Sequence, residues 1–147
     1  LEAQSVPSAS LVPCVRSLPA SWTFGAANAR NGWSKFTLDH PQVGAPALVV
    51  RLTANCDTTG AVPAPPDQTG TRRYERTEPG RTNPAATSYT VFPGGCVTAQ
   101  FRSTSNDDGA LIDQAASAIG FTTRHALQQA LDQRSNGRLH LDPGEPD

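Results

Sequence analysis

The sequence predicts an α+β fold in which an antiparallel β-sheet carries a C-terminal two-helix hairpin on one face and is stabilised by a disulfide. Three features indicate this fold. Residues 89–102, YTVFPGGCVTAQFR, have the composition and the Pro-Gly-Gly turn of a β-hairpin. Residues 45–56 alternate as a strand, and two amphipathic stretches follow near the C-terminus.

The 147-residue length is that of one domain, which we expect to span residues 11–143. Prolines and glycines number 13 and 12, and only 17% of residues are charged, which favours a loop-rich fold over a helical bundle. Residues 1–10 look like a polar linker of the kind that remains when a signal peptide or membrane anchor is removed. Residues 144–147 are expected to be a disordered tail.

The first part of the chain is the least regular. Two prolines interrupt residues 11–29, so Leu18, Trp22 and Phe24 are expected to fill the core from an irregular segment. Residues 32–38 suggest a short strand with a bulge at its start. Residues 45–56 are the clearest strand, with Leu48, Val50 and Leu52 on one face.

The middle of the chain combines loops with the hairpin. Residues 57–71 contain three prolines and no periodicity, which predicts an exposed, mobile loop. Residues 71–77 are a charged edge-strand candidate. The hairpin strands are placed at 89–92 and 97–102, joined by the turn at 93–95.

Two helices are expected after residue 109, at 110–119 and 124–134. Gly120 suits the end of the first helix, and Thr122 or Thr123 can cap the start of the second. A final short strand is expected at 138–141.

Three cysteines are present, Cys14, Cys56 and Cys96, and none has the spacing of a zinc site. We expect Cys56 and Cys96 to form a disulfide, with two buried free thiols as the alternative. Cys56 is in phase with the apolar residues of its own strand, whereas Cys96 is out of phase with Val97 and Phe101. A bulge near Gly95 would therefore be needed to bring both cysteines to the same face. Cys14 would then be unpaired or bonded to a second chain, which allows a dimer.

Residues 111–132 look like a bacterial helix-turn-helix in which Gly-Phe-Thr-Thr opens the recognition helix. The charges of residues 109–137 sum to zero, however, whereas DNA-binding modules neutralise several phosphates. The net charge of −1 likewise offers no global attraction for nucleic acid or acidic membranes. DNA binding is therefore the rival interpretation.

The candidate ligand-binding residues are Arg72, Arg73, Tyr74 and Arg76. Together with Arg81, and offset by Glu75 and Glu78, they could contact phosphate, sulfate or an anionic cell-wall polymer. The alternative is the solvated face of an edge strand, where charge prevents association of sheets. His40, His125 and His140 are expected at the surface. The alternative is that His40 and His140, together with Asp39 or Asp142, form a metal or acid/base site if their strands adjoin. No catalytic residue, metal or cofactor is predicted.

A resemblance is carried by FTLDH (36–40), VRLTANC (50–56), GTRRYER (70–76), YTVFPGGCVT (89–98), IGFTTRHAL (119–127) and GRLHLDP (137–143). Together these segments resemble uncharacterised extracellular domains of membrane-anchored proteins from high-GC Gram-positive, actinobacterial-type bacteria. The resemblance implies an extracytoplasmic, secreted or membrane-anchored domain at the cell envelope. A non-enzymatic binding or structural role is expected there, with an envelope protein or an anionic cell-wall polymer as partner. The alternatives are a cytoplasmic helix-turn-helix regulator and a small extracellular hydrolase.

Overall fold

The computed structural model describes residues 5–66, 69–76, 87–102 and 109–135. The main layer is a seven-stranded antiparallel sheet with strand order β2-β3-β4-β8-β7-β6-β5, and β1 and β9 pair as a separate two-stranded ribbon. In chain order the elements are β1 (Leu11–Val15), β2 (Thr23–Arg30), β3 (Trp33–His40), β4 (Gly44–Thr53), β5 (Val62–Ala64), β6 (Arg72–Arg76), β7 (Thr87–Phe92), β8 (Gly95–Phe101), α2 (Gly109–Ala118), β9 (Ile119–Thr123) and α3 (Arg124–Ser135).

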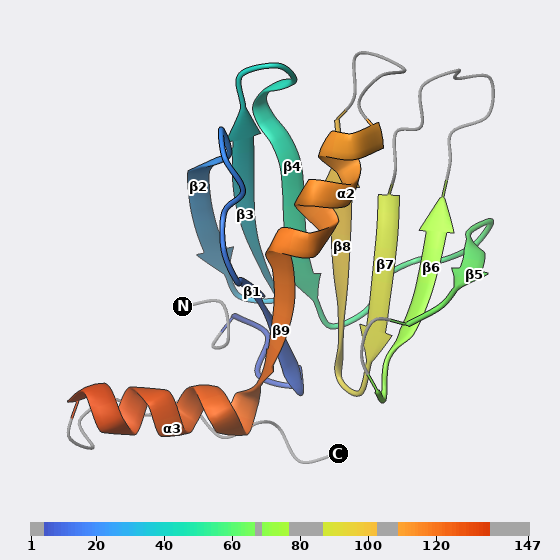
Figure 1. Ribbon diagram of the computed structural model, residues 1–147. Coiled ribbons are helices and arrows are strands. Elements are labelled where there is room, and N and C mark those ends of the chain that lie inside the picture. The colour runs from blue at the N-terminus through green and yellow to red at the C-terminus, as the bar shows by residue number, and fades with distance from the viewer. Residues whose placement is uncertain (1–4, 67–68, 77–86, 103–108, 136–147) are drawn as a thin grey trace.

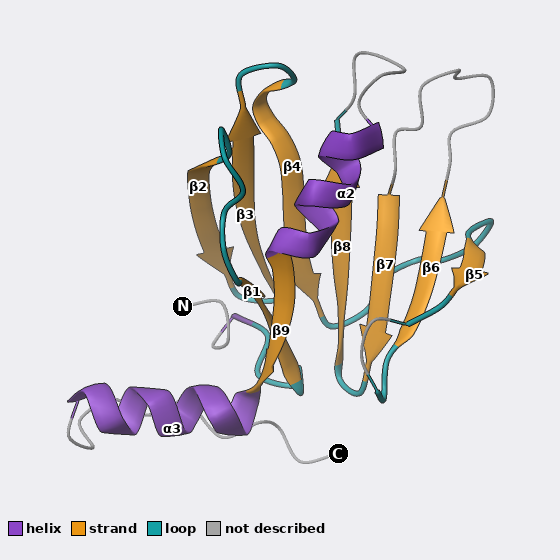
Figure 2. Cartoon of the chain, viewed as in Figure 1, coloured by secondary structure: helices purple, strands orange, loops and turns teal. Residues whose placement is uncertain are grey.

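The core lies between the large sheet and a layer formed by α2 and the β1–β9 ribbon, which cross in front of the sheet in Figures 1 and 2. Side chains alternate between the two faces of a strand, so alternate residues of β3, β4 and β8 line this inner face. The buried residues that the sheet contributes include Phe36, Leu38, Leu48, Val50, Leu52, Val97 and Phe101. The predicted fold is therefore confirmed as a mostly antiparallel β-sheet with helices near the C-terminal end.

The predicted hairpin is β7 and β8. Phe92 pairs with Gly95, so Pro93 and Gly94 form a two-residue turn. Proline fixes its own φ, and Gly94 has a φ of 79°, as the third position of a type II turn requires. This element follows from local sequence alone.

The Cys56–Cys96 disulfide is confirmed, with a Cα–Cα distance of 5.9 Å. The bulge expected near Gly95 is wrong, because β8 pairs with β4 and β7 without a register shift. The phase conflict disappears since β4 ends at Thr53, and Cys56 therefore reaches Cys96 from outside the strand. Cys14 has a free, half-buried thiol, and dimerisation through it stays a prediction.

The N-terminal segment belongs partly to the core, which corrects the expectation of a linker up to residue 10. Val6 and Ala9 are buried, and Gly32 N–H donates to Ser5 O at 2.8 Å. The Ser8 and Ser10 hydroxyls each donate at 2.7 Å, to Gly94 O and Pro93 O respectively. Residues 5–10 therefore close one end of the sheet by binding its turns.

Both predicted helices exist, but the segment between them is the strand β9, which pairs with β1 from Leu11↔Thr123 to Val15↔Ile119. Only α2 packs on the sheet, through Leu111 and Ala115. Helix α3 has no buried residue and points away from the sheet in Figure 1. The hairpin is thus confirmed in part, and the tight turn that a helix-turn-helix needs is replaced by extended backbone.

Three local expectations need correction. The bulges lie in β2, between Phe24 and Ala27, and at the end of β3, rather than at the start of β3. Leu18 and Phe24 are 40% and 53% exposed, whereas Trp22 is buried as expected. His40 is buried against Trp22 rather than at the surface.

The expected loop at 57–71 contains a strand, because β5 gains a partner in β6. The strand expected at 138–141, the tail and the residues His140, Arg81 and Glu78 lie outside the described residues. In the part of the chain that the structure describes, no helix is long and apolar enough to span a bilayer.

Candidate functional site

The outer face of the sheet is defined as the side opposite Leu48, Val50 and Leu52. Residues paired directly across antiparallel strands point to the same face, so the register fixes which side chains are neighbours there. One row across β2, β3, β4, β8, β7, β6 and β5 consists of Asn28, Lys35, Arg51, Thr98, Tyr89, Tyr74 and Pro63. The adjoining row from β2 to β6 consists of Arg30, Trp33, Thr53, Cys96, Val91 and Arg72.

Two cationic residues lie side by side in the first row, on neighbouring strands. Lys35 is paired directly with Arg51, an arrangement that destabilises a sheet because like charges lie side by side. Arg30 adds a third cation on the same face, and the only carboxylate on the outer face of β2, β3 and β4 is Asp39. Asp39 lies two strand positions beyond Thr37, at the opposite end from Arg30. A bound anion would relieve the repulsion between Lys35 and Arg51.

An aromatic side chain completes this group. The Arg51 guanidinium lies 5.4 Å from the centre of the Trp33 ring, a cation–π geometry. Trp33 is half-buried on the outer face, whereas Trp22 is buried on the inner face. We call Arg30, Trp33, Lys35 and Arg51 the basic face.

The four predicted ligand-binding residues do not form one cluster. Arg72, Tyr74 and Arg76 point to the outer face, because they alternate along β6. Arg73 points to the other side, where its guanidinium lies 2.9 Å from the Glu75 carboxylate. The alternation of a strand therefore divides the cluster that the sequence presents as continuous.

Arg76 is engaged in holding the chain. Its guanidinium lies 5.5 Å from the centre of the Tyr89 ring and donates to the carbonyl oxygens of Thr59 and Asp57. These carbonyls belong to residues 54–61, the crossover segment, which connects β4 to β5 and runs behind β8 and β7 in Figure 1. The Cys56–Cys96 bond fixes the same segment at its other end.

Asp57 stabilises the crossover locally. Its carboxylate accepts a hydrogen bond from Thr59 N–H at 2.9 Å. A side-chain and a main-chain hydrogen bond from Thr59, assisted by the charge of Arg76, hold the pKa of Asp57 below its ordinary value. Arg76 thus joins the crossover to the ring of Tyr89, which is only 8% exposed. The basic face lies on β2, β3 and β4.

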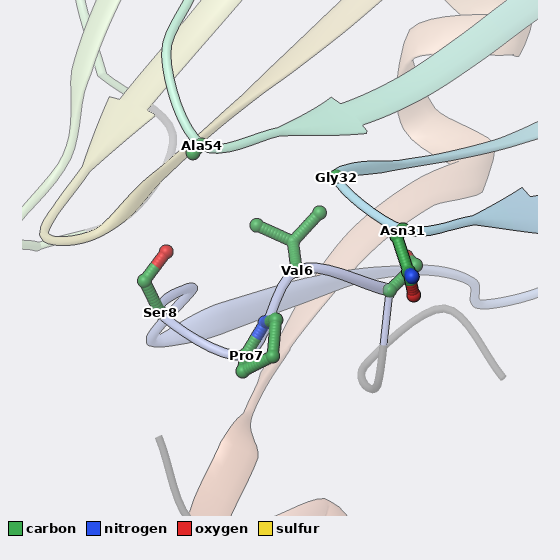
Figure 3. A pocket seen from close by; sticks show the side chains of 7 residues that line it. Val6, Pro7, Ser8, Asn31, Gly32 and Ala54 are labelled. Carbon is green, nitrogen blue, oxygen red and sulfur yellow. The ribbon is translucent and has the colours of Figure 1, made fainter. Parts of the chain in front are cut away.

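A pocket of about 260 Å³ opens where the N-terminal segment meets the strand ends. In Figure 3 the Val6 side chain points from this segment towards Gly32 and Ala54. The residues that line the pocket are uncharged: Ser5, Val6, Pro7, Ser8, Asn31, Gly32 and Ala54. The pocket therefore offers no counterpart for an ionic ligand.

The described ranges contain no cluster of three His, Cys, Asp or Glu side chains that could hold a metal ion. His40 Nδ1 accepts from Gln42 N–H at 3.1 Å, and its ring packs 5.0 Å from that of Trp22. His125 lies on α3 and is exposed. The described histidines have no shared site.

Sequence reasoning missed the basic face. The available signal was the alternation of Trp33 and Lys35 out of phase with Phe36 and Leu38, which assigns the two pairs to opposite faces. Arg51 was assignable to the face opposite Val50 by the same rule. What the sequence does not contain is the pairing of β3 with β4 that sets Lys35 beside Arg51.

No family model, curated protein or solved structure matches this chain.

Proposed function

We propose that this chain is a non-enzymatic extracytoplasmic domain of a secreted or membrane-anchored bacterial protein that binds an anionic polymer of the cell envelope. The observation that carries the proposal is the Lys35–Arg51 pair, which places two positive charges side by side on the outer face next to Trp33. The polymer supplies the negative charge that the protein leaves out of this row.

The ligand class follows from the geometry of the basic face. Its cations are carried on three neighbouring strands, β2, β3 and β4, and this favours a ligand with repeated charges over a single small ion. Trp33 offers an apolar ring edge beside the cations, which suits a sugar or polyol unit between phosphates or carboxylates. Arg30 and Arg51 on this face are exposed, as binding to a long chain requires.

The location is supported by the disulfide. Such bonds persist in oxidising compartments and are rare in the cytosol, so Cys56–Cys96 is compatible with an extracytoplasmic location. The resemblance to extracellular domains of membrane-anchored proteins points in the same direction.

Binding can be followed through Trp33 in a Trp22→Phe background. Poly(glycerol phosphate), a simple phosphate polymer, should change the Trp33 emission at low salt, whereas neutral dextran of similar length should not. The double variant Lys35→Gln, Arg51→Gln should bind about tenfold more weakly, because each exposed ionic contact contributes up to about 1 kcal/mol. Added salt should weaken binding further.

Arg73→Gln is the matched control for the single variants Lys35→Gln and Arg51→Gln, since each removes one positive charge and Arg73 lies on the other side of the sheet. If Arg73→Gln weakens binding as much as either single variant does, only net charge matters and the basic face is not the site. Equal binding of dextran would remove the charge argument altogether.

A further inference from the structure

The two lateral edges of the large sheet are built differently. At one edge β5 has only three residues, one of which is Pro63. At the other edge β2 has eight residues, all exposed, with neither proline nor lysine among them. Short strands, proline and lysine are the usual protection against strand addition, so β5 is protected and β2 is largely open.

The protection of β2 is confined to its first half. The bulge between Phe24 and Ala27 interrupts the ladder, and the Ala26 N–H there donates to Thr37 Oγ1 at 2.9 Å. From Ala27 to Arg30 the pairing with β3 is regular. The second half of β2 is therefore a straight, exposed edge.

The main-chain groups available at this edge follow from the register. Arg30 pairs with Trp33 across the two-residue Asn31-Gly32 turn, and the residues flanking such a turn form a hydrogen-bonded pair. Since hydrogen-bonded and non-hydrogen-bonded pairs alternate, Ala27 and Ala29 direct their N–H and C=O groups away from β3. These groups are placed to receive another strand.

We infer that β2 accepts an extended segment of another protein as an additional strand, and that this segment alternates acidic with apolar side chains. Strand addition of this kind takes affinity from main-chain hydrogen bonds and specificity from alternate side chains. Arg30 and Lys35 belong to the basic face as well, but the inference does not depend on polymer binding, because the affinity comes from main-chain groups at the lateral edge of the sheet.

The chemistry of the segment is set by what lies on each face of β2. On the outer face Arg30 ends the strand, and Lys35 follows on the next strand, so carboxylates are the complementary side chains. On the inner face Phe24 is 53% exposed and stacks on Phe36 at 6.0 Å, so apolar side chains would cover it. A second copy of this chain is a poorer occupant, since Thr23–Arg30 contains no acidic residue to place opposite Arg30.

The test uses a short peptide of alternating glutamate and valine, with a lysine–valine peptide as the charge control. Hydrogen exchange should show new protection of the Ala27 and Ala29 amides with the acidic peptide only. Ala29→Pro should weaken binding about tenfold, because it removes one outward N–H while the pairs to β3 remain. Arg30→Glu should weaken binding severalfold, and Arg73→Glu should have no effect.

Unchanged affinity of Ala29→Pro, provided its circular dichroism matches that of the original chain, would overturn the inference. So would equal binding of the two peptides, or protection of β2 by self-association in the absence of peptide. Ala29→Pro should retain the response of Trp33 to poly(glycerol phosphate), so failure of the edge and failure of the polymer site give different results.

Discussion

Gly94 is held by two constraints at once. Its φ of 79° is a conformation that residues with a side chain rarely adopt, and a Cβ atom there would collide with the main-chain oxygen of Ser8. Gly60 has a similar φ of 81° but open space around it. Comparing substitutions at Gly60 and Gly94 therefore distinguishes the cost of the backbone conformation from the cost of disturbing the contact with the N-terminal segment.

We expect Gly60→Ala to lower the free energy of unfolding by about 1 kcal/mol, the cost of the left-handed conformation. Gly94→Ala should cost at least about 1 kcal/mol more, because residues 8–10 must move away from the turn. Urea denaturation measures both. Equal losses would show that the N-terminal segment does not bear on Gly94.

Asp57 provides a pH-dependent test of the crossover. Its lowered pKa means that the folded state favours the carboxylate, so this contribution is present above the ordinary pKa of 3.8 and is lost as the pH falls below it. An NMR titration of the carboxyl group should give a value below 3.8.

Variants that remove these interactions should raise the Asp57 pKa in proportion to the contribution that each interaction makes. Thr59→Val removes the hydroxyl group that makes the largest contribution, so it should raise the Asp57 pKa more than Arg76→Gln does. A larger rise of the Asp57 pKa in Arg76→Gln would mean that the charge of Arg76, rather than hydrogen bonding from Thr59, is the main cause of the lowered pKa.

At the level of elements, the sequence predicts what is local and misses what depends on a distant partner. The β7–β8 hairpin and the two helices were predictable because the Pro93-Gly94 turn and the apolar periodicity are contained within them. The ribbon of β1 and β9 was not, since Pro13 and Gly120 both argue against strands and each strand exists through the other. The small residues in the middle of β2, GAANA, have little strand preference and become part of a strand because β3 offers a partner.

The disulfide attaches the crossover segment to the sheet, because it joins Cys56 to Cys96. Cys56 and Cys96 are 40 residues apart, and on the chain-entropy model a loop of this size contributes about 4 kcal/mol to the free energy of unfolding. Cys56→Ser with Cys96→Ser should lose most of this and should speed amide exchange in residues 54–61. Cys14→Ser is the control, and it should leave exchange in the crossover unchanged. A crossover that exchanges equally slowly without the disulfide would show that Arg76 alone holds it.

At the scale of the whole molecule, the net charge of −1 gives no sign that the two faces of the large sheet differ in charge. The inner face of β3, β4 and β8 is mostly apolar and buried, whereas the outer face of β2, β3 and β4 collects three cations against one carboxylate. The α+β class could be predicted because alternation and helical periodicity are properties of single segments. The basic face could not, because it depends on the pairing of β3 with β4 that sets Lys35 beside Arg51.

Lys35 is the only lysine in the sequence, and this permits the most direct measurement of polymer binding. The rate at which an amine-selective acylating reagent modifies Lys35 can be followed by mass spectrometry, with the α-amino group as internal reference. Poly(glycerol phosphate) should slow acylation of Lys35 relative to the α-amino group, and neutral dextran should leave the ratio unchanged. An unchanged ratio when the phosphate polymer is bound would contradict the assignment of the basic face as its site.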